Sequence, residues 1–307
     1  MKNQTTITTE TFEPRLRDLL GQAVKRLARA GIESARLDAE VLLGHALAMS
    51  REQLVAGADS RLGAEQAERF EALILRRLGR EPVAYITGRQ EFWSLDFQVT
   101  RAVLIPRPET ERLIEVALRL AARLRSDKPA RVLDVGTGSG AIAVSLAKEL
   151  PAAKIFATDI SPAALAVARA NASLNDVARQ MTFLSGDLFG ALGEEAARFD
   201  LIVSNPPYLQ SEEIATLEPE VSEWEPCAAL DGGRDGLDFY RRIAAQAGRF
   251  LTPHGAVVAE IGALMGSGVA ALFNRAGVYR DVTIVQDYAC RDRVAVAKNA
   301  ADLAGSN

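Results

Sequence analysis

Apolar residues at the start of the chain recur at the spacing of amphipathic helices. Leu16, Leu20, Val24 and Leu27 fall on one face of a first helix, and Gly31 is placed to end it. Further helix starts are indicated by polar residues that can cap a first turn, which are Ser34 and the capping-box pair Ser50 and Gln53. The pattern predicts a small helical bundle over residues 1–87.

The hydrophobic period changes after residue 87. Gly88 interrupts the helical pattern, and apolar residues between Phe92 and Val99 alternate with polar ones as they do in a strand or hairpin. We therefore predict a β-hairpin linker over residues 88–109. A helix whose acidic first turn suits the helix dipole is predicted to begin at Thr110 and Glu111, which opens a third segment, residues 110–307.

Short apolar runs alternate with helical segments from Arg131 onward, which is typical of a parallel sheet covered on both faces. The last two runs are separated by a short loop, residues 287–292, so they are expected to pair antiparallel. The predicted fold class is α/β, a doubly wound and mostly parallel seven-stranded sheet. The expected strands are 131–135, 154–160, 181–184, 201–204, 256–261, 282–286 and 293–297.

The composition is that of a globular protein, with 48% hydrophobic and 25% charged residues among 307. A net charge of -4 argues against a protein that mainly grips a nucleic-acid backbone, so no stable nucleic-acid binding is expected. Cys227 and Cys290 lie far apart without a neighbouring ligand pattern, so neither a disulfide nor a metal site is predicted. Because no apolar stretch resembles a signal core or a membrane span, we expect a cytoplasmic protein without membrane attachment.

A glycine-rich turn follows the first predicted strand of the sheet and precedes a helix near Ala141. Its residues are Gly136, Thr137, Gly138, Ser139 and Gly140. Glycines let the backbone approach a ligand closely, and the unpaired N–H groups of a helix N-terminus attract anionic groups. NAD-binding folds use a related loop, so the turn predicts a cofactor site without deciding between NAD and S-adenosylmethionine.

Two further strand ends carry candidate cofactor ligands. Asp159 ends the next strand, before Ser161 as the expected N-cap of a helix, and its carboxylate can accept both ribose hydroxyls of either cofactor. Asp187 and Leu188 follow the third strand, where they can accept from an adenine amino group and pack on the ring. The alternative for Asp187 is a structural role, as a loop residue that caps the following turn.

The segment Asn205-Pro206-Pro207-Tyr208 follows the fourth strand and is the most specific motif in the chain. Consecutive prolines fix the backbone, so the Asn205 side chain and the adjacent carbonyl groups are held rigidly. A planar NH2 group has two donors in one plane, which the Asn205 side-chain oxygen and the Pro206 carbonyl can accept. Tyr208 can pack against the planar group. This arrangement turns the face of the nitrogen toward a cofactor methyl group and so favours S-adenosylmethionine.

These motifs together resemble those of the peptide chain release factor N5-glutamine methyltransferases, the HemK or PrmC family. The resemblance covers nearly the whole chain. The matching stretches are Tyr85 to Gly88, Glu91-Phe92, Leu104 to Glu111, the glycine loop, Asn205 to Tyr208, Glu225-Pro226, Leu230 to Gly233, Asp235 to Leu237, and Arg291 to Arg293.

The resemblance implies a methyltransferase that uses S-adenosylmethionine and no metal, and we expect the protein to be a monomer. It implies that the helical bundle 1–87 docks a release factor, whose Gly-Gly-Gln glutamine enters the pocket at Asn205 to Tyr208. Substrate binding then falls to Asn205, Pro206, Pro207 and Tyr208, and catalysis to Asn205, Pro206 and Tyr208. The cofactor is expected to contact the whole glycine loop, from Gly136 through Thr137, Gly138 and Ser139 to Gly140, together with Asp159, Asp187, Leu188 and Asn205.

Arginines in the predicted bundle can form a docking face for that partner. They include Arg69, Arg76, Arg77 and Arg80. Charge alone is equally compatible with an ordinary solvated helix surface.

Other functions remain open from the residues alone. An N6-adenine nucleic-acid methyltransferase would present the same planar NH2 group to Asn205, although the acidic balance and the lack of a basic recognition segment disfavour it. A catalytically silent module that only holds a protein partner is disfavoured by the intact glycine loop. A glutamine in a ribosomal protein is a third alternative.

Overall fold

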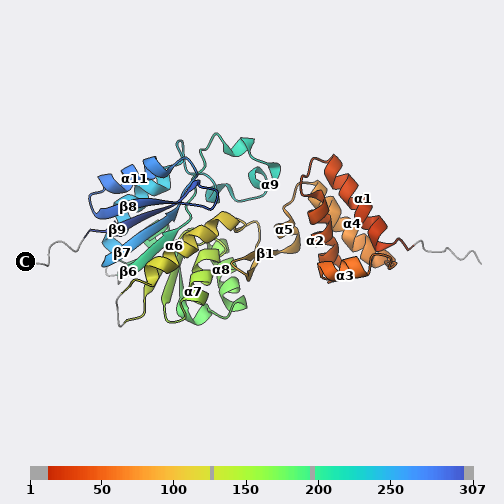
Figure 1. Cartoon of the computed structure of the whole chain (residues 1–307), viewed down its shortest axis with the longest axis horizontal. Helices are drawn as coiled ribbons and strands as arrows, with labels where there is room; N and C mark the ends of the chain where they lie inside the picture. Colours follow the sequence, from red (N-terminus) through yellow and green to blue (C-terminus); the bar gives the residue numbers. More distant parts are fainter. Residues whose placement is uncertain (1–12, 125–127, 194–197, 301–307) are drawn as a thin grey trace, which may run out of the picture. The chain divides into compact units, whose positions relative to one another are not determined.

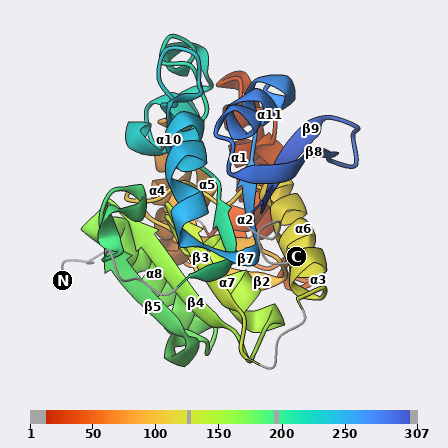
Figure 2. The same cartoon turned by 90° about the vertical axis from the view of Figure 1, so that its left-hand side faces the viewer.

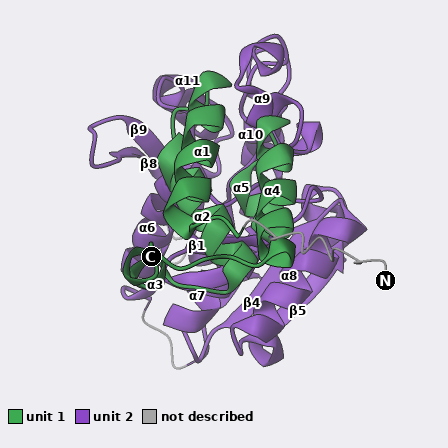
Figure 3. Ribbon diagram, turned by 90° about the vertical axis from the view of Figure 1, so that its right-hand side faces the viewer, with its two compact units in different colours: residues 1–87 green, residues 88–307 purple. Residues whose placement is uncertain are grey.

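The computed structural model describes residues 13–124, 128–193 and 198–300. The chain divides into two compact units, unit 1 (Met1–Thr87) and unit 2 (Gly88–Asn307), which are drawn in Figures 1 and 3. Each unit has its own hydrophobic core. None of the described helices is long and apolar enough to cross a membrane.

Unit 1 is a helical bundle, as the hydrophobic pattern predicts. The capping box at Ser50 is confirmed, since its hydroxyl accepts from the backbone N–H of Gln53 while the Gln53 side chain accepts from the backbone N–H of Ser50. The cap expected at Ser34 is wrong: its side chain makes no capping hydrogen bond to described residues, because its backbone (φ -83°, ψ 18°) is not extended. The helices are α1 (Leu16–Arg29), α2 (Ala35–Leu47), α3 (Arg51–Ala56), α4 (Ala64–Leu78) and α5 (Val83–Thr87).

Two of the arginines proposed for a docking face make ion pairs within the bundle. Arg77 is only 5% exposed, and its Nε donates to Asp38 at 2.7 Å. Asp38 is buried as well, and removing one partner of such a pair would leave an uncompensated buried charge. Arg76 forms a second ion pair with Glu81 at 2.6 Å. Arg77 therefore holds α4 to α2 and is not available to a partner.

Unit 2 is built on a seven-stranded sheet in the order β5-β4-β3-β6-β7-β9-β8. The strands β5, β4, β3, β6 and β7 run parallel to one another. Strand β9 pairs antiparallel with both β7 and β8. The doubly wound, mostly parallel sheet and its antiparallel final pair are thus confirmed. The strands are β3 (Arg131–Val135), β4 (Lys154–Asp159), β5 (Met181–Ser185), β6 (Phe199–Ser204), β7 (Leu251–Glu260), β8 (Tyr279–Gln286) and β9 (Asp292–Asn299).

Helices cover both faces of this sheet (Figures 1 and 2). Alternate residues of each strand face opposite cores, so Val132 contributes to one hydrophobic cluster and its neighbour Leu133 to the other. The first cluster lies under α6 (Glu111–Ala121), α7 (Ala141–Glu149) and α8 (Pro162–Leu174), and the second under α10 (Asp238–Gln246) and α11 (Gly266–Arg275). The order of strands reverses between β3 and β6, and such a switch point opens a crevice at the carboxyl ends of the strands.

The hairpin of β1 (Arg89–Phe92) and β2 (Leu95–Gln98) belongs to unit 2 and is not a free linker. Phe92 and Phe97 are buried in the first hydrophobic cluster. The buried Asn171 on α8 fixes the edge of β2, because its Oδ1 accepts from the Gln98 backbone N–H at 2.7 Å and its Nδ2 donates to the Gln98 carbonyl at 2.9 Å. The chain that follows the hairpin is thereby anchored beside the carboxyl ends of the strands.

Candidate active site

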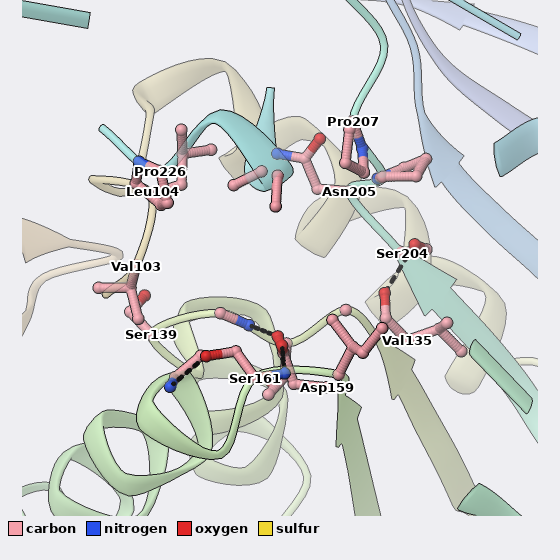
Figure 4. Close-up of a pocket in the computed structure, with 18 of the residues that line it drawn as sticks. Val103, Leu104, Val135, Ser139, Asp159, Ser161, Ser204, Asn205, Pro207 and Pro226 are labelled. Carbon is pink, nitrogen blue, oxygen red and sulfur yellow. Dashed lines mark hydrogen bonds between the residues drawn. The ribbon is translucent and has the colours of Figure 1, made fainter. Parts of the chain in front are cut away.

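A cavity lies at the carboxyl ends of β3, β4, β5 and β6, at the switch point of the sheet. Figure 4 shows Asp159, Ser161 and Ser139 on one side of it and Asn205 and Pro207 on the opposite side. The residues that line the cavity include every predicted site residue except Gly140 and Tyr208. They also include residues that follow the hairpin of β1 and β2. The predicted residues that line it are Gly136, Thr137, Gly138, Ser139, Asp159, Asp187, Leu188, Asn205, Pro206 and Pro207.

The glycine loop takes a backbone course that only glycine adopts without strain. Gly136, Gly138 and Gly140 have φ angles of 74°, 55° and 81°, all in the left-handed region. Gly140 is absent from the described lining of the cavity and has a packing role, since an added Cβ would lie 3.1 Å from the Cβ of Ala168 on α8. The third glycine is therefore explained by the close approach of α7 and α8.

Asp159 ties the glycine loop to the start of α8. Its Oδ2 accepts from the backbone N–H of Gly138 at 2.8 Å, and its Oδ1 accepts from that of Ser161 at 2.8 Å (Figure 4). Ser161 in turn caps α8, as predicted, through a hydrogen bond from the Ala164 backbone N–H to its hydroxyl. One carboxylate thus holds two of the loops that line the cavity.

Asp134 is a buried carboxyl group beneath the loop that the motif analysis did not single out. Its side chain is fully buried, and Oδ2 accepts from the Thr137 hydroxyl at 2.6 Å. Burial raises the pKa of Asp134 to about 7, an effect that the hydrogen bond from Thr137 opposes and the nearby Asp159 carboxylate reinforces. A charged residue inside the apolar run Val132 to Val135 was the sequence signal for this position.

We expect Asp134→Asn to stabilise unit 2 more at pH 8 than at pH 5. The pKa in the folded state is raised above the ordinary aspartate value of 3.8, so this carboxyl group contributes most to stability below that value, and the contribution is lost as pH rises toward 7. At about 1.4 kcal/mol per pKa unit, the free energy of unfolding of the variant relative to the parent should rise by on the order of 2–4 kcal/mol across this window. Urea unfolding followed by Trp93 and Trp224, both in unit 2, measures the difference. An equal difference at pH 5 and pH 8 would contradict it.

Asn205 stands at the end of β6, with its side chain on the wall of the cavity. Its Nδ2 donates to the Thr110 hydroxyl at 3.2 Å. Below it, the Ser204 hydroxyl donates to the Val135 carbonyl of β3 at 2.7 Å, which ties the two central strands together at the mouth of the cavity. The side-chain oxygen of Asn205 is not used by Thr110.

Tyr208 is the second predicted residue that the described lining does not include. Its ring packs partly buried against the second hydrophobic cluster, and burial, together with the charge of Glu260, raises the pKa of its hydroxyl. The loop that follows α9 (Pro219–Ser222) supports its backbone: the Leu209 N–H donates to the Leu230 carbonyl at 3.0 Å, and an added Cβ on Gly232 would lie 2.8 Å from the Tyr208 Cα. Glycine at 232 is required by this close approach.

Asp187 and Leu188 reach the cavity from the end of β5. Asp187 is exposed and accepts from Arg242 of α10 at 2.6 Å; its side chain makes no capping bond among the described residues. Leu188 is buried with φ at 49°, a conformation that a branched side chain rarely adopts. Backbone strain of this kind collects at ligand sites.

Residues after the hairpin complete the cavity and were not among the predicted site residues. Val103, Arg107 and Thr110 line it, and Arg107 forms a close ion pair with the buried Glu225. Burial raises the pKa of Glu225, and the charge of Arg107 opposes the rise. Both arginine and glutamate lie within stretches on which the family resemblance rests, which was the signal that could have placed them in the site.

Two family patterns match the chain, one on each side of residue 88. The family described as "PrmC N-terminal domain" matches residues 18–88, and "Methyltransferase small domain" matches residues 115–218. Among solved structures, the hMettl16 catalytic domain in complex with an RNA hairpin is 18% identical with a TM-score of 0.54, over 77% of this chain and 82% of that one. Human methyltransferase 10 domain containing protein is 21% identical with a TM-score of 0.52, over 68% and 90%. These two likenesses concern the fold alone.

Full-length relatives are much closer. A release factor glutamine methyltransferase of Moorella thermoacetica is 46% identical over 92% of this chain and 98% of its own length. The protein of the same name from Cereibacter sphaeroides is 48% identical over 92% and 98%, and that from Geobacter sulfurreducens 46% identical over 87% and 91%. With the helical unit, the methyltransferase sheet and the cavity at its switch point all in place, the chain belongs to the release factor glutamine methyltransferase family.

Proposed function

We propose that the chain transfers a methyl group from S-adenosylmethionine to the side-chain amide nitrogen of the Gly-Gly-Gln glutamine of peptide chain release factors. One observation carries the proposal: Asn205 lies on the wall of the same cavity as the glycine loop and Asp159. This cavity brings a holder for a planar amide and a holder for an adenosyl cofactor together. The names of the full-length relatives support the choice of substrate.

The residues present fit S-adenosylmethionine. Gly136 and Gly138 line the cavity, and an added Cβ at either would meet no heavy atom within 4 Å beyond its chain neighbours, so a side chain would enter the open space. Asp159 presents a carboxylate for ribose hydroxyls, and Leu188 presents an apolar surface for a purine ring. When bound, the cofactor supplies a methyl group activated by a positively charged sulfur.

The amide substrate is held by acceptors alone. In our proposal the Asn205 side-chain oxygen and the Pro206 carbonyl accept the two N–H groups of the glutamine amide, which leaves a face of the nitrogen open for methyl transfer. An amide nitrogen is a weak nucleophile, so exact placement supplies much of the rate. The same two oxygens would stabilise the positive charge that grows on the nitrogen as the N–C bond forms and the sulfur–methyl bond breaks. The cofactor would leave as the neutral thioether S-adenosylhomocysteine, and the methylated amide would then lose one proton to water.

We further propose that unit 1 binds the body of the release factor. Every described residue that lines the cavity belongs to unit 2, which supports a role for residues 13–87 other than holding cofactor. Unit 1 has its own core, and the family pattern that it matches is described as the PrmC N-terminal domain.

The test of substrate is mass spectrometry of a release factor after incubation with the protein and isotopically labelled S-adenosylmethionine. We expect one methyl group on the Gly-Gly-Gln glutamine, and none on the same factor with that glutamine changed to alanine. A short Gly-Gly-Gln peptide should be methylated with a KM far above that of the intact factor, because it cannot contact unit 1. Label in nucleic acid, or equal label in the alanine factor, would contradict the substrate, while equal KM values would contradict the role of unit 1.

A further inference from the structure

Thr110 lies beside both the side-chain amide of Asn205 and the buried carboxyl group of Glu260. Thr110 is 4% exposed, lies at the end of the short 3-10 helix η1 (Pro108–Thr110) and lines the cavity. Its hydroxyl oxygen accepts the hydrogen bond from Asn205 Nδ2 at 3.2 Å. The same hydroxyl lies beside the side chain of Glu260, the last residue of β7, where it lowers the pKa of that carboxyl group. Three elements far apart in sequence therefore meet at one side chain.

Glu260 is fixed in position, but one oxygen of its carboxyl group lacks a hydrogen-bond donor among the described residues. It is 1% exposed, and its Oε2 has no hydrogen-bond partner in the part of the chain that the structure describes. Burial raises its pKa to about 7, while Thr110, Arg293 and Arg107 act in the opposite direction and Glu109 adds to the rise. The hydroxyl of Tyr240 donates to its backbone carbonyl at 2.6 Å, which fixes the strand end. A buried carboxylate short of donors is a strong acceptor for any hydroxyl beside it.

The single hydroxyl proton of Thr110 decides how Asn205 is turned. A threonine hydroxyl has one proton to donate and lone pairs to accept with. Where Glu260 is charged, its carboxylate is the natural acceptor of that proton, so Thr110 offers only a lone pair to Asn205, and a lone pair selects Nδ2 rather than Oδ1. The two orientations of an asparagine amide have nearly the same shape, so hydrogen bonds choose between them.

We propose that Thr110, itself held by Glu260, is a positioning residue that turns the Asn205 side-chain oxygen toward the substrate amide. This inference rests on the proposed function for the identity of the substrate. In the reverse orientation, the NH2 group of Asn205 would face the NH2 group of the substrate, donor against donor. The relay would thereby exclude the orientation that cannot accept an N–H, without touching the substrate.

Substitutions at Thr110 separate the hydroxyl from the methyl group. Thr110→Val keeps the shape and removes the hydroxyl, whereas Thr110→Ser keeps the hydroxyl and removes the methyl group. We expect the valine variant to lose about 10- to 100-fold in kcat, with little change in KM for the release factor or in Kd for S-adenosylmethionine. The serine variant should stay within about threefold of the parent. A role in packing alone predicts the opposite order, because serine leaves a buried gap.

A measurement that needs no substrate tests whether Thr110 orients Asn205, even if the parent methylates some other molecule. In protein labelled with 15N-asparagine, the Asn205 side-chain NH2 signals are assigned by their loss in Asn205→Asp. We expect them to shift and to exchange faster with water in Thr110→Val than in the parent or in Thr110→Ser. Where valine does not fold, Thr110→Ala and Thr110→Ser form the same contrast, since both lack the methyl group. Asn205 NH2 signals that are the same in Thr110→Val as in the parent would overturn the proposal, and so would equal kcat values for the variants with and without the hydroxyl. A parent protein that leaves the release factor unmethylated would overturn only the proposed function.

Discussion

Asn205→Ala should lower kcat for methylation of a release factor by about 100- to 1000-fold, the usual cost of removing a preorganised polar contact to a reacting group. The substitution removes the oxygen that we propose accepts from the glutamine amide, and also the Nδ2 bond to Thr110. It should not unfold the protein, because Asn205 is only half-buried at a strand end and Ser204 still ties β6 to β3. Cofactor affinity should change much less than kcat.

Asn205→Asp is the matched variant for the role of the oxygen. Aspartate keeps an acceptor of nearly the same shape, gives up the donor to Thr110 and adds a negative charge near the methyl donor. If orientation by an acceptor is the main role, aspartate should retain clearly more activity than alanine. The measurement is the rate of methyl incorporation into an intact release factor, beside the same factor with its glutamine changed to alanine. Near-parental turnover by the alanine variant would remove Asn205 from catalysis.

The sheet was predictable because its central strands are apolar runs bounded by turn residues. The largest difference is instructive: β7 was expected to begin at residue 256 but begins at Leu251. Pro253 and Gly255 are residue types that usually mark turns, yet they lie within the strand, where the pairing with β6 shifts register between Phe199 and Leu201. An added Cβ on Gly255 would lie 2.9 Å from the Phe199 carbonyl, so the glycine marks a close approach and not a break.

Some residues of the candidate site could be placed from the sequence, and others could not. Asp159 and Asn205 could be placed because one ends a strand and the other follows one, and parallel strands bring their carboxyl ends to one edge of the sheet. Thr110 could not, since its partner Asn205 is 95 residues away and no local pattern records the pairing. Gly140 shows that a predicted role can hide a second one: its place in a cofactor loop suggested ligand contact, and the structure adds that its lack of a Cβ serves the packing of α7 on α8. Roles that depend on tertiary proximity alone are invisible in one sequence.

Asp159→Ala should weaken the binding of S-adenosylmethionine by roughly 10- to 1000-fold, with less effect on the chemical step. Each charge-assisted hydrogen bond from a ribose hydroxyl is worth about 1.5 to 3 kcal/mol at most. Part of the loss should come from the protein itself, because the alanine also frees the backbone N–H groups of Gly138 and Ser161 from their 2.8 Å bonds. The two contributions can be separated.

Asp159→Asn separates them, because an amide has one oxygen where both carboxylate oxygens now accept from backbone N–H groups. Its NH2 group must face either Gly138 or Ser161, donor against donor, so the loop should be disturbed and affinity should fall although a ribose acceptor remains. Ser161→Ala is the control: it removes the cap of α8, worth about 1 kcal/mol of stability, but keeps the backbone N–H that Asp159 accepts. Calorimetric titration with S-adenosylmethionine should therefore rank the affinities as parent and Ser161→Ala above both Asp159 variants. If Asp159→Ala binds S-adenosylmethionine as tightly as the parent, this carboxylate is not part of the site. If only Asp159→Asn keeps the parental affinity, the bonds of Asp159 to the two loops are dispensable, and its contact with the ribose carries the whole effect.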